Sequence, residues 1–93
     1  MAWYQVVIEC SGVPTKAGLQ GSKDITKNFA RRPWHQGATC KWDGKNLRMT
    51  AENDFDAAGI FLQNEFSDEV SACIGGGCDD LRVISITDLS PDA

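Results

Sequence analysis

The 93-residue chain is predicted to fold as one α+β domain with the element order β-α-β-β-α-β. Three observations predict this order. Segments rich in β-branched residues stand near both ends of the chain, and a hairpin signal stands in its middle. Two segments with apolar residues at helical spacing separate these strands. A chain of this length accommodates one domain, residues 1–93, with one core.

The first strand is expected over residues 3–10, where apolar and polar side chains alternate. A helix should follow within residues 15–31. Ser22 is a candidate N-cap for a shorter version of this helix. Pro33 ends any helix that reaches it, because proline disrupts helical hydrogen bonding.

The middle of the chain carries the hairpin signal. Residues 35–42 and 45–52 alternate apolar and polar side chains, and Asp43–Gly44 between them is a typical two-residue turn. In that register Cys40 lies opposite Leu47. Both are expected on the buried face of the sheet, with the charged and hydroxyl side chains of the hairpin on the other face.

A second helix is expected over residues 51–77. Asn53 or Asp54 can cap it, and Asp56 in its first turn suits the helix dipole. The glycines at 75–77 are expected to end it with a left-handed residue. Its core stripe has i+3 and i+4 spacing and consists of Phe55, Ala58, Leu62, Phe66, Val70 and Cys73.

The last strand is expected over residues 81–89, before a frayed tail at 90–93. The six elements together predict a ferredoxin-like, or split βαβ, two-layer sandwich. In this topology the antiparallel sheet has the order 4-1-3-2, and both helices lie on one face. The helix-covered face should take Tyr4, Val6, Ile8, Ile84 and Ile86.

The opposite face of the predicted sheet would then expose an apolar patch. It consists of Trp3, Val7, Leu81 and Val83. A patch of this kind is unusual on a small monomer. We therefore expect a homodimer that buries the patch about a twofold axis.

Charge and composition narrow the class of protein. The net charge is −4, from 9 basic and 13 acidic residues, which argues against nonspecific nucleic-acid binding. The first residues lack the basic and apolar regions of a signal peptide, and no apolar run approaches the roughly 18 residues that cross a membrane. We expect a cytoplasmic protein with reduced thiols that binds neither nucleic acid nor a membrane.

The sequence assigns no residue to catalysis and predicts neither a metal nor a cofactor. Glycines 75–77 follow a helix, whereas a phosphate loop places glycines before one. An alternative hypothesis is a small enzyme or a metal-binding protein, whose site would gather at one sheet edge from Cys10, His35, Asp54, Cys78 and Asp79. The thiols of Cys10 and Cys78 should lie on neighbouring strands, and whether they form a disulfide is left open.

The segment RRPWHQG is the best local candidate for a binding surface. Arg31 and Arg32 end the first helix, and Trp34 and His35 begin the next strand, so the four side chains would form an exposed recognition patch. The sequence therefore predicts a non-catalytic binding or assembly module that is homodimeric and takes a small ligand or a protein partner. A further alternative is an acidic inhibitor of a nucleic-acid-binding partner, which would need one continuous acidic stripe.

Four short segments, RPWH, KWDG, AENDFD and EFSDEVSAC, resemble a group of short uncharacterised bacterial proteins. The resemblance spans residues 31–73. It implies no activity, no cofactor and no catalytic residue.

Overall fold

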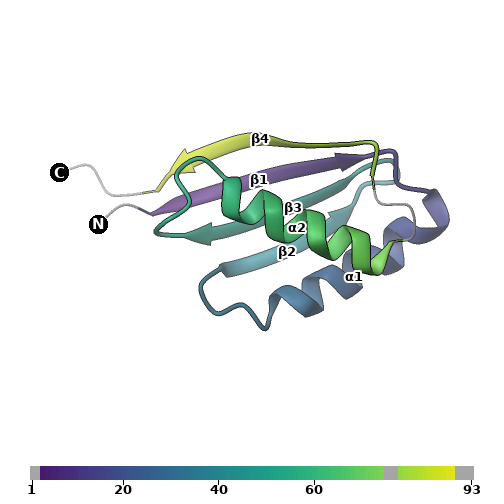
Figure 1. Ribbon diagram of the computed structural model, residues 1–93, viewed down its shortest axis with the longest axis horizontal. Helices are drawn as coiled ribbons and strands as arrows, with labels where there is room; N and C mark the ends of the chain where they lie inside the picture. Colours follow the sequence, from purple (N-terminus) through teal and green to yellow (C-terminus); the bar gives the residue numbers. More distant parts are fainter. Residues whose placement is uncertain (1–2, 75–77, 90–93) are drawn as a thin grey trace.

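The computed structural model describes residues 3–74 and 78–89 and contains two helices and four strands (Figure 1). In chain order the elements are β1 (Tyr4–Ser11), α1 (Thr15–Phe29), β2 (Gln36–Trp42), β3 (Leu47–Asn53), α2 (Ile60–Cys73) and β4 (Asp80–Asp88). The expected left-handed glycine at 75–77 and the expected tail at 90–93 lie outside the described residues.

The four strands form one antiparallel sheet in the order β2-β3-β1-β4. Read from the other edge, the neighbours are β4, β1, β3 and β2. Figure 1 shows both helices in front of the same face of this sheet, with α2 over the central strands. The fold is therefore α+β with two layers, and its core lies between the sheet and the helices.

The core consists of the apolar side chains on one side of each strand and helix. Alternate residues of β1 and β3 are buried, and one stripe of each helix covers them. The buried side chains from the strands are Val6, Ile8, Cys10, Cys40, Leu47, Met49 and Ala51, and those from the helices are Ile25, Phe29, Leu62, Phe66 and Val70. Burial of one such large side chain stabilises the fold by about 1.5–3 kcal/mol.

The first helix begins earlier than a cap at Ser22 would allow. Pro14 precedes its first residue, and the Pro14 carbonyl accepts from the amide of Ala17 at 2.9 Å. Ser22 is buried within the helix and donates its hydroxyl to the Leu19 carbonyl at 2.7 Å, so it is not a cap. Gly18 in helix α1 makes room for the indole of Trp42, which packs where the Cβ of a larger residue would lie.

The hairpin turn is longer than predicted. Trp42 pairs with Leu47 and Cys40 with Met49, so the loop is the four-residue segment 43–46 and the predicted register was wrong by two residues. Asp43 explains the loop, because its Oδ1 accepts from the amides of Lys45 at 2.8 Å and Asn46 at 2.6 Å. These two donors hold the pKa of Asp43 below its usual value. A shift of two residues keeps every side chain on its predicted face.

Helix α2 also begins later than predicted. Asn53 ends β3, and the helix starts at Ile60 after Gly59, whose φ is +75°. Phe55 and Ala58 are therefore exposed loop residues and not members of the core stripe. The loop replaces the expected first turns because Asn53 Oδ1 accepts from the amides of Phe55 and Asp56, which closes a local turn.

A bulge in β4 overturns the predicted faces of Leu81 and Val83. Ile8 pairs with Val83, whereas Val7 pairs with Ser85, so Ile84 has no partner on β1. The extra residue reverses the alternation of side chains along β4. Leu81 and Val83 consequently pack against the core on the helix-covered face, and Ile84 is exposed. Ile86 pairs with Val6, so it stays on its predicted face, but it is exposed there. The predicted apolar patch of Trp3, Val7, Leu81 and Val83 is therefore not one surface.

Candidate functional site

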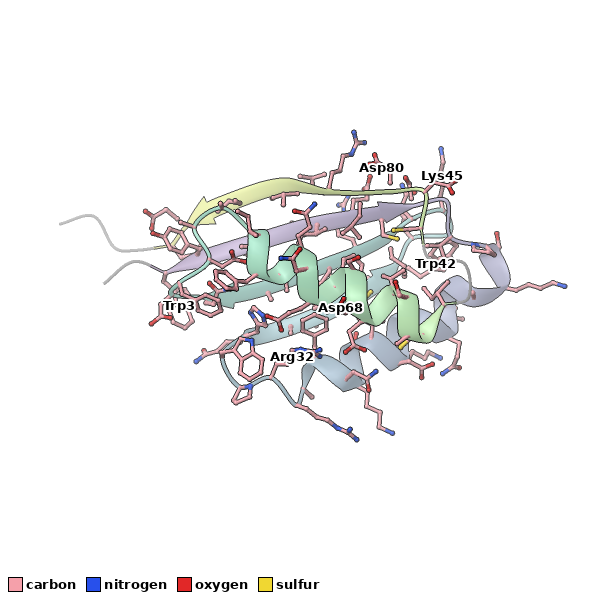
Figure 2. The ribbon with its side chains drawn as sticks, in the orientation of Figure 1. Trp3, Arg32, Trp42, Lys45, Asp68 and Asp80 are labelled. Carbon is pink, nitrogen blue, oxygen red and sulfur yellow. The ribbon has the colours of Figure 1, made fainter. Side chains whose placement is uncertain are left out.

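An open groove lies between the C-terminal end of α1 and the side of α2 that faces it. Its volume is about 530 Å³, and its lining consists of Asn28, Arg31, Arg32, Trp34, Glu69 and Ala72. Helix α1 ends at Phe29, and a turn then brings Arg32 and Trp34 beside α2 before β2 begins. Figure 2 shows Arg32 between the two helices.

Arg32 joins the two helices as a charged clamp. Its Nε lies 2.8 Å from Glu65 Oε2, and its Nη2 lies 2.9 Å from Glu69 Oε2. The guanidinium also stacks over the ring of Phe29, at 4.7 Å from its centroid. The two glutamates are one helical turn apart on α2, so a single planar guanidinium reaches both. The clamp fixes the floor of the groove and neutralises part of its acidic side.

Glu65 collects further donors from the segment that follows α1. The indole Nε1 of Trp34 lies 3.2 Å from Glu65 Oε1, and Nε2 of His35 also lies 3.2 Å from that oxygen. With Arg32 on Oε2, both carboxylate oxygens of Glu65 are engaged. Trp34 thus has its indole Nε1 bound to Glu65, while the residue as a whole is half exposed, at 49%.

His35 is held in one tautomer. Asn53 Oδ1 accepts two backbone amides, so its Nδ2 is the atom that donates to His35 Nδ1, at 3.2 Å. Nδ1 is therefore an acceptor and carries no hydrogen. The hydrogen of the neutral ring is on Nε2, which donates it to Glu65.

Arg31 differs from Arg32 in that it is uncommitted. Its side chain is exposed at the groove and makes no hydrogen bond or ion pair within residues 3–74 and 78–89, whereas its backbone amide donates to the Asn28 carbonyl. The groove thus combines a solvated guanidinium with an accessible indole face. Such a pair suits a ligand with a planar apolar part and an anionic group, because guanidinium binds carboxylate and phosphate oxygens and indole stacks on flat rings.

The structure brings three of the four predicted binding residues together. Arg31, Arg32 and Trp34 line the groove, whereas His35 has a fully buried side chain and is not part of an exposed patch. Sequence reasoning missed the partners on α2, Glu65 and Glu69. Their i,i+4 spacing on the second helix was the available signal.

The predicted sheet-edge cluster is divided between the two ends of the sheet. Strands β1 and β3 are antiparallel, so Tyr4 pairs with Asn53 while Cys10 pairs with Leu47. His35 and Asp54 therefore lie about 20 Å, or six strand residues, from Cys10. Among the described residues no group of three histidine, cysteine or acidic side chains is arranged to hold a metal ion. The five residues of the alternative enzyme or metal site therefore do not meet at one edge of the sheet.

Three of its members lie near one another. Cys78 and Asp79 are close enough to Cys10 to raise its pKa, and both thiols are free. Burial raises the pKa of Cys10 far above its usual value, and the neighbouring Cys78 raises it further. Burial likewise raises the pKa of Cys40 to about 12. Neither buried thiol is activated as a nucleophile.

The acidic residues do not form one stripe on the sheet face opposite the helices. Arg48 lies 2.9 Å from Glu9 on this face, and Arg82 lies 3.8 Å from Asp80. The continuous acidic surface that an inhibitor of a nucleic-acid-binding protein would need is thus interrupted by cations.

Comparisons with known proteins add no relative. No family model, no curated protein and no solved structure matches the chain. Within the part of the chain that the structure describes, neither helix has the length and apolar character needed to cross a membrane.

Proposed function

We propose that this chain is a non-catalytic binding module whose ligand occupies the groove between α1 and α2. The observation that carries the proposal is the pair of Arg31 and Trp34, one an uncommitted cation and the other an exposed ring, beside a clamp that is already saturated. Because Arg32 already forms ion pairs with Glu65 and Glu69, a ligand can bind to Arg31 and Trp34 without breaking these ion pairs.

The ligand class follows from these groups. The Trp34 indole offers its face, since its Nε1 is bound to Glu65. Arg31 offers donors to an anion. We infer a small molecule that carries a planar ring and a carboxylate or phosphate group. The open groove and the exposed Arg31 side chain imply weak binding, because one exposed ion pair contributes only about 0.2–1 kcal/mol.

The topology is consistent with this proposal. We assign the fold to the ferredoxin-like class, on the basis of the element order, the neighbours of each strand and the common face of the helices. Fold alone does not indicate a ligand. The side of the sheet away from the helices carries Glu9 and Glu52, which disfavours a nucleic-acid backbone there, so the proposal names no nucleic-acid partner.

Side-chain ¹H–¹⁵N NMR tests the proposal with indole-3-acetate as the anionic probe and indole-3-acetamide as its uncharged analogue. We expect both probes to shift the Trp34 indole signal, and only indole-3-acetate to shift the Arg31 Nε–H signal. The variant Arg31→Gln should weaken indole-3-acetate binding about two- to fivefold and leave indole-3-acetamide binding unchanged.

Lys27→Gln is the matched control, because Lys27 is an exposed cation in the last turn of α1 that does not line the groove. If Lys27→Gln weakens binding as much as Arg31→Gln, the effect is one of net charge and the groove is not the site. Equal shifts at Trp3 and Trp42, which lie at opposite ends of the molecule (Figure 2), would also contradict the proposal.

A further inference from the structure

The loop between β3 and α2 and the first turn of α2 form an exposed surface without charge. Residues 55–61 read FDAAGIF, and their one charged side chain, Asp56, is buried. In a chain with 24% charged residues this is a local exception. We call it the apolar end surface, and its exposed members are Phe55, Ala57, Ala58, Ile60, Phe61 and, from β4, Ile86.

These residues form one continuous surface. The rings of Phe55 and Phe61 meet edge to face, with their centroids 5.3 Å apart. Gly59 lies against Val6 and Val83, and Val6 is the cross-strand partner of Ile86. Ile86 therefore lies on the same side of the sheet as Val6, beyond the cover of α2.

The exposed conformation of this segment is built into the fold. Asp56 accepts from the amides of Phe61 at 3.1 Å and Leu62 at 2.9 Å, and Asn53 accepts from those of Phe55 and Asp56. The backbone is therefore held with its apolar side chains outward. A loop under no other constraint would turn these side chains toward the core, because burial of each would be favourable.

We propose that the apolar end surface is the contact between two copies of this chain. Exposures of 37% to 57% for the four large side chains, together with the two alanines, amount to about 400–500 Å² of apolar area. A standard interface buries about 800 Å² on each partner, of which somewhat more than half is apolar. The available area therefore matches what a stable twofold dimer needs.

The charge distribution allows a second copy to bind at this surface. Each copy carries a net charge of −4, so most contacts between two copies bring carboxylates together. The centre of the apolar end surface carries no exposed carboxylate, and Asp54 lies only at its margin. Residual repulsion between the copies is screened by salt, so the dimer should be stronger at high ionic strength. An interface built on ion pairs would show the opposite dependence.

Sedimentation equilibrium of the full chain from about 5 to 500 µM tests the proposal. We expect a reversible dimer whose dissociation constant falls when NaCl is raised from 50 to 500 mM. Phe61→Asp should raise the dissociation constant at least tenfold. Leu19→Asp is its matched control, since Leu19 and Phe61 are both helix residues with 57% exposure and the substitution adds the same charge.

Each result decides the matter. A parent that is monomeric at 500 µM, or a Phe61→Asp variant that dimerises like the parent, overturns the proposal. So does an equal loss in Leu19→Asp, which would assign the effect to net charge. Ile60→Asp serves as the second variant if Phe61→Asp shows a changed melting curve. Arg31 lies outside this surface, so loss of groove binding and loss of the dimer are separate results.

Discussion

Asn53 fixes the ring of His35 within the buried core, because its Nδ2 lies 3.2 Å from His35 Nδ1 while its Oδ1 accepts two backbone amides. The end of β3 is thereby connected through His35 to Glu65 on α2 and to the groove. One asparagine thus orders both the loop that carries the apolar end surface and the carboxylate that anchors Trp34.

We expect Asn53→Ala to lower the free energy of unfolding by about 2–3 kcal/mol, since it removes three hydrogen bonds and leaves a buried ring nitrogen without a donor. Urea denaturation measures this change. Asn64→Ala, at an exposed position of α2, is the control and should cause no loss. Equal stability of the two variants would mean that the Asn53 contacts are not formed in solution.

Asp56→Ala should destabilise the protein by about 1–2 kcal/mol, because the Asp56 carboxylate caps two amides at the start of α2. Asp68→Ala provides the comparison, since Asp68 is an exposed carboxylate on the same helix (Figure 2) and its loss should change stability by less than about 0.5 kcal/mol. Thermal unfolding followed by circular dichroism distinguishes them. A neutral Asp56→Ala variant would show that α2 does not depend on this cap.

Gly18→Ala should be destabilising, although the same change in most helices stabilises by up to about 1 kcal/mol. The added Cβ would overlap the Trp42 indole, and such overpacking typically costs about 1–3 kcal/mol. In a Trp42→Leu background the penalty should disappear, which a double-mutant cycle of unfolding free energies tests. If Gly18→Ala stabilises the parent protein, the Trp42 indole does not pack against Gly18 in solution.

Stability should decrease as the pH rises from about 9 toward 12, in part through Cys40. Its pKa is about 12 in the folded protein and 9.0 without the effects of the fold, so above pH 9 the unfolded chain loses a proton that the native thiol retains. Urea midpoints between pH 7 and 11 measure the slope. The urea midpoint of Cys40→Ala should fall less steeply with pH than that of the parent. An equal slope in the two proteins would contradict the burial of this thiol.

The alternating and helical patterns of the sequence determined the order of elements and the buried residues of β1, β3 and α2, because burial of Val6, Ile8, Leu62 and Phe66 follows from local periodicity. The same local chemistry singled out Arg31, Arg32 and Trp34, which line the groove. These features depend on residues close together in the chain, so a single sequence contains the signal for them.

Only the tertiary structure decided the features that depend on residues distant in the chain. The bulge at Ile84 is a mismatch between β4 and β1, and it alone moves Leu81 and Val83 into the core. His35 is buried because Asn53 and Glu65, 18 and 30 residues away, satisfy its ring nitrogens. A local pattern cannot show a partner on another element, and a polar side chain without a visible partner is expected to be exposed.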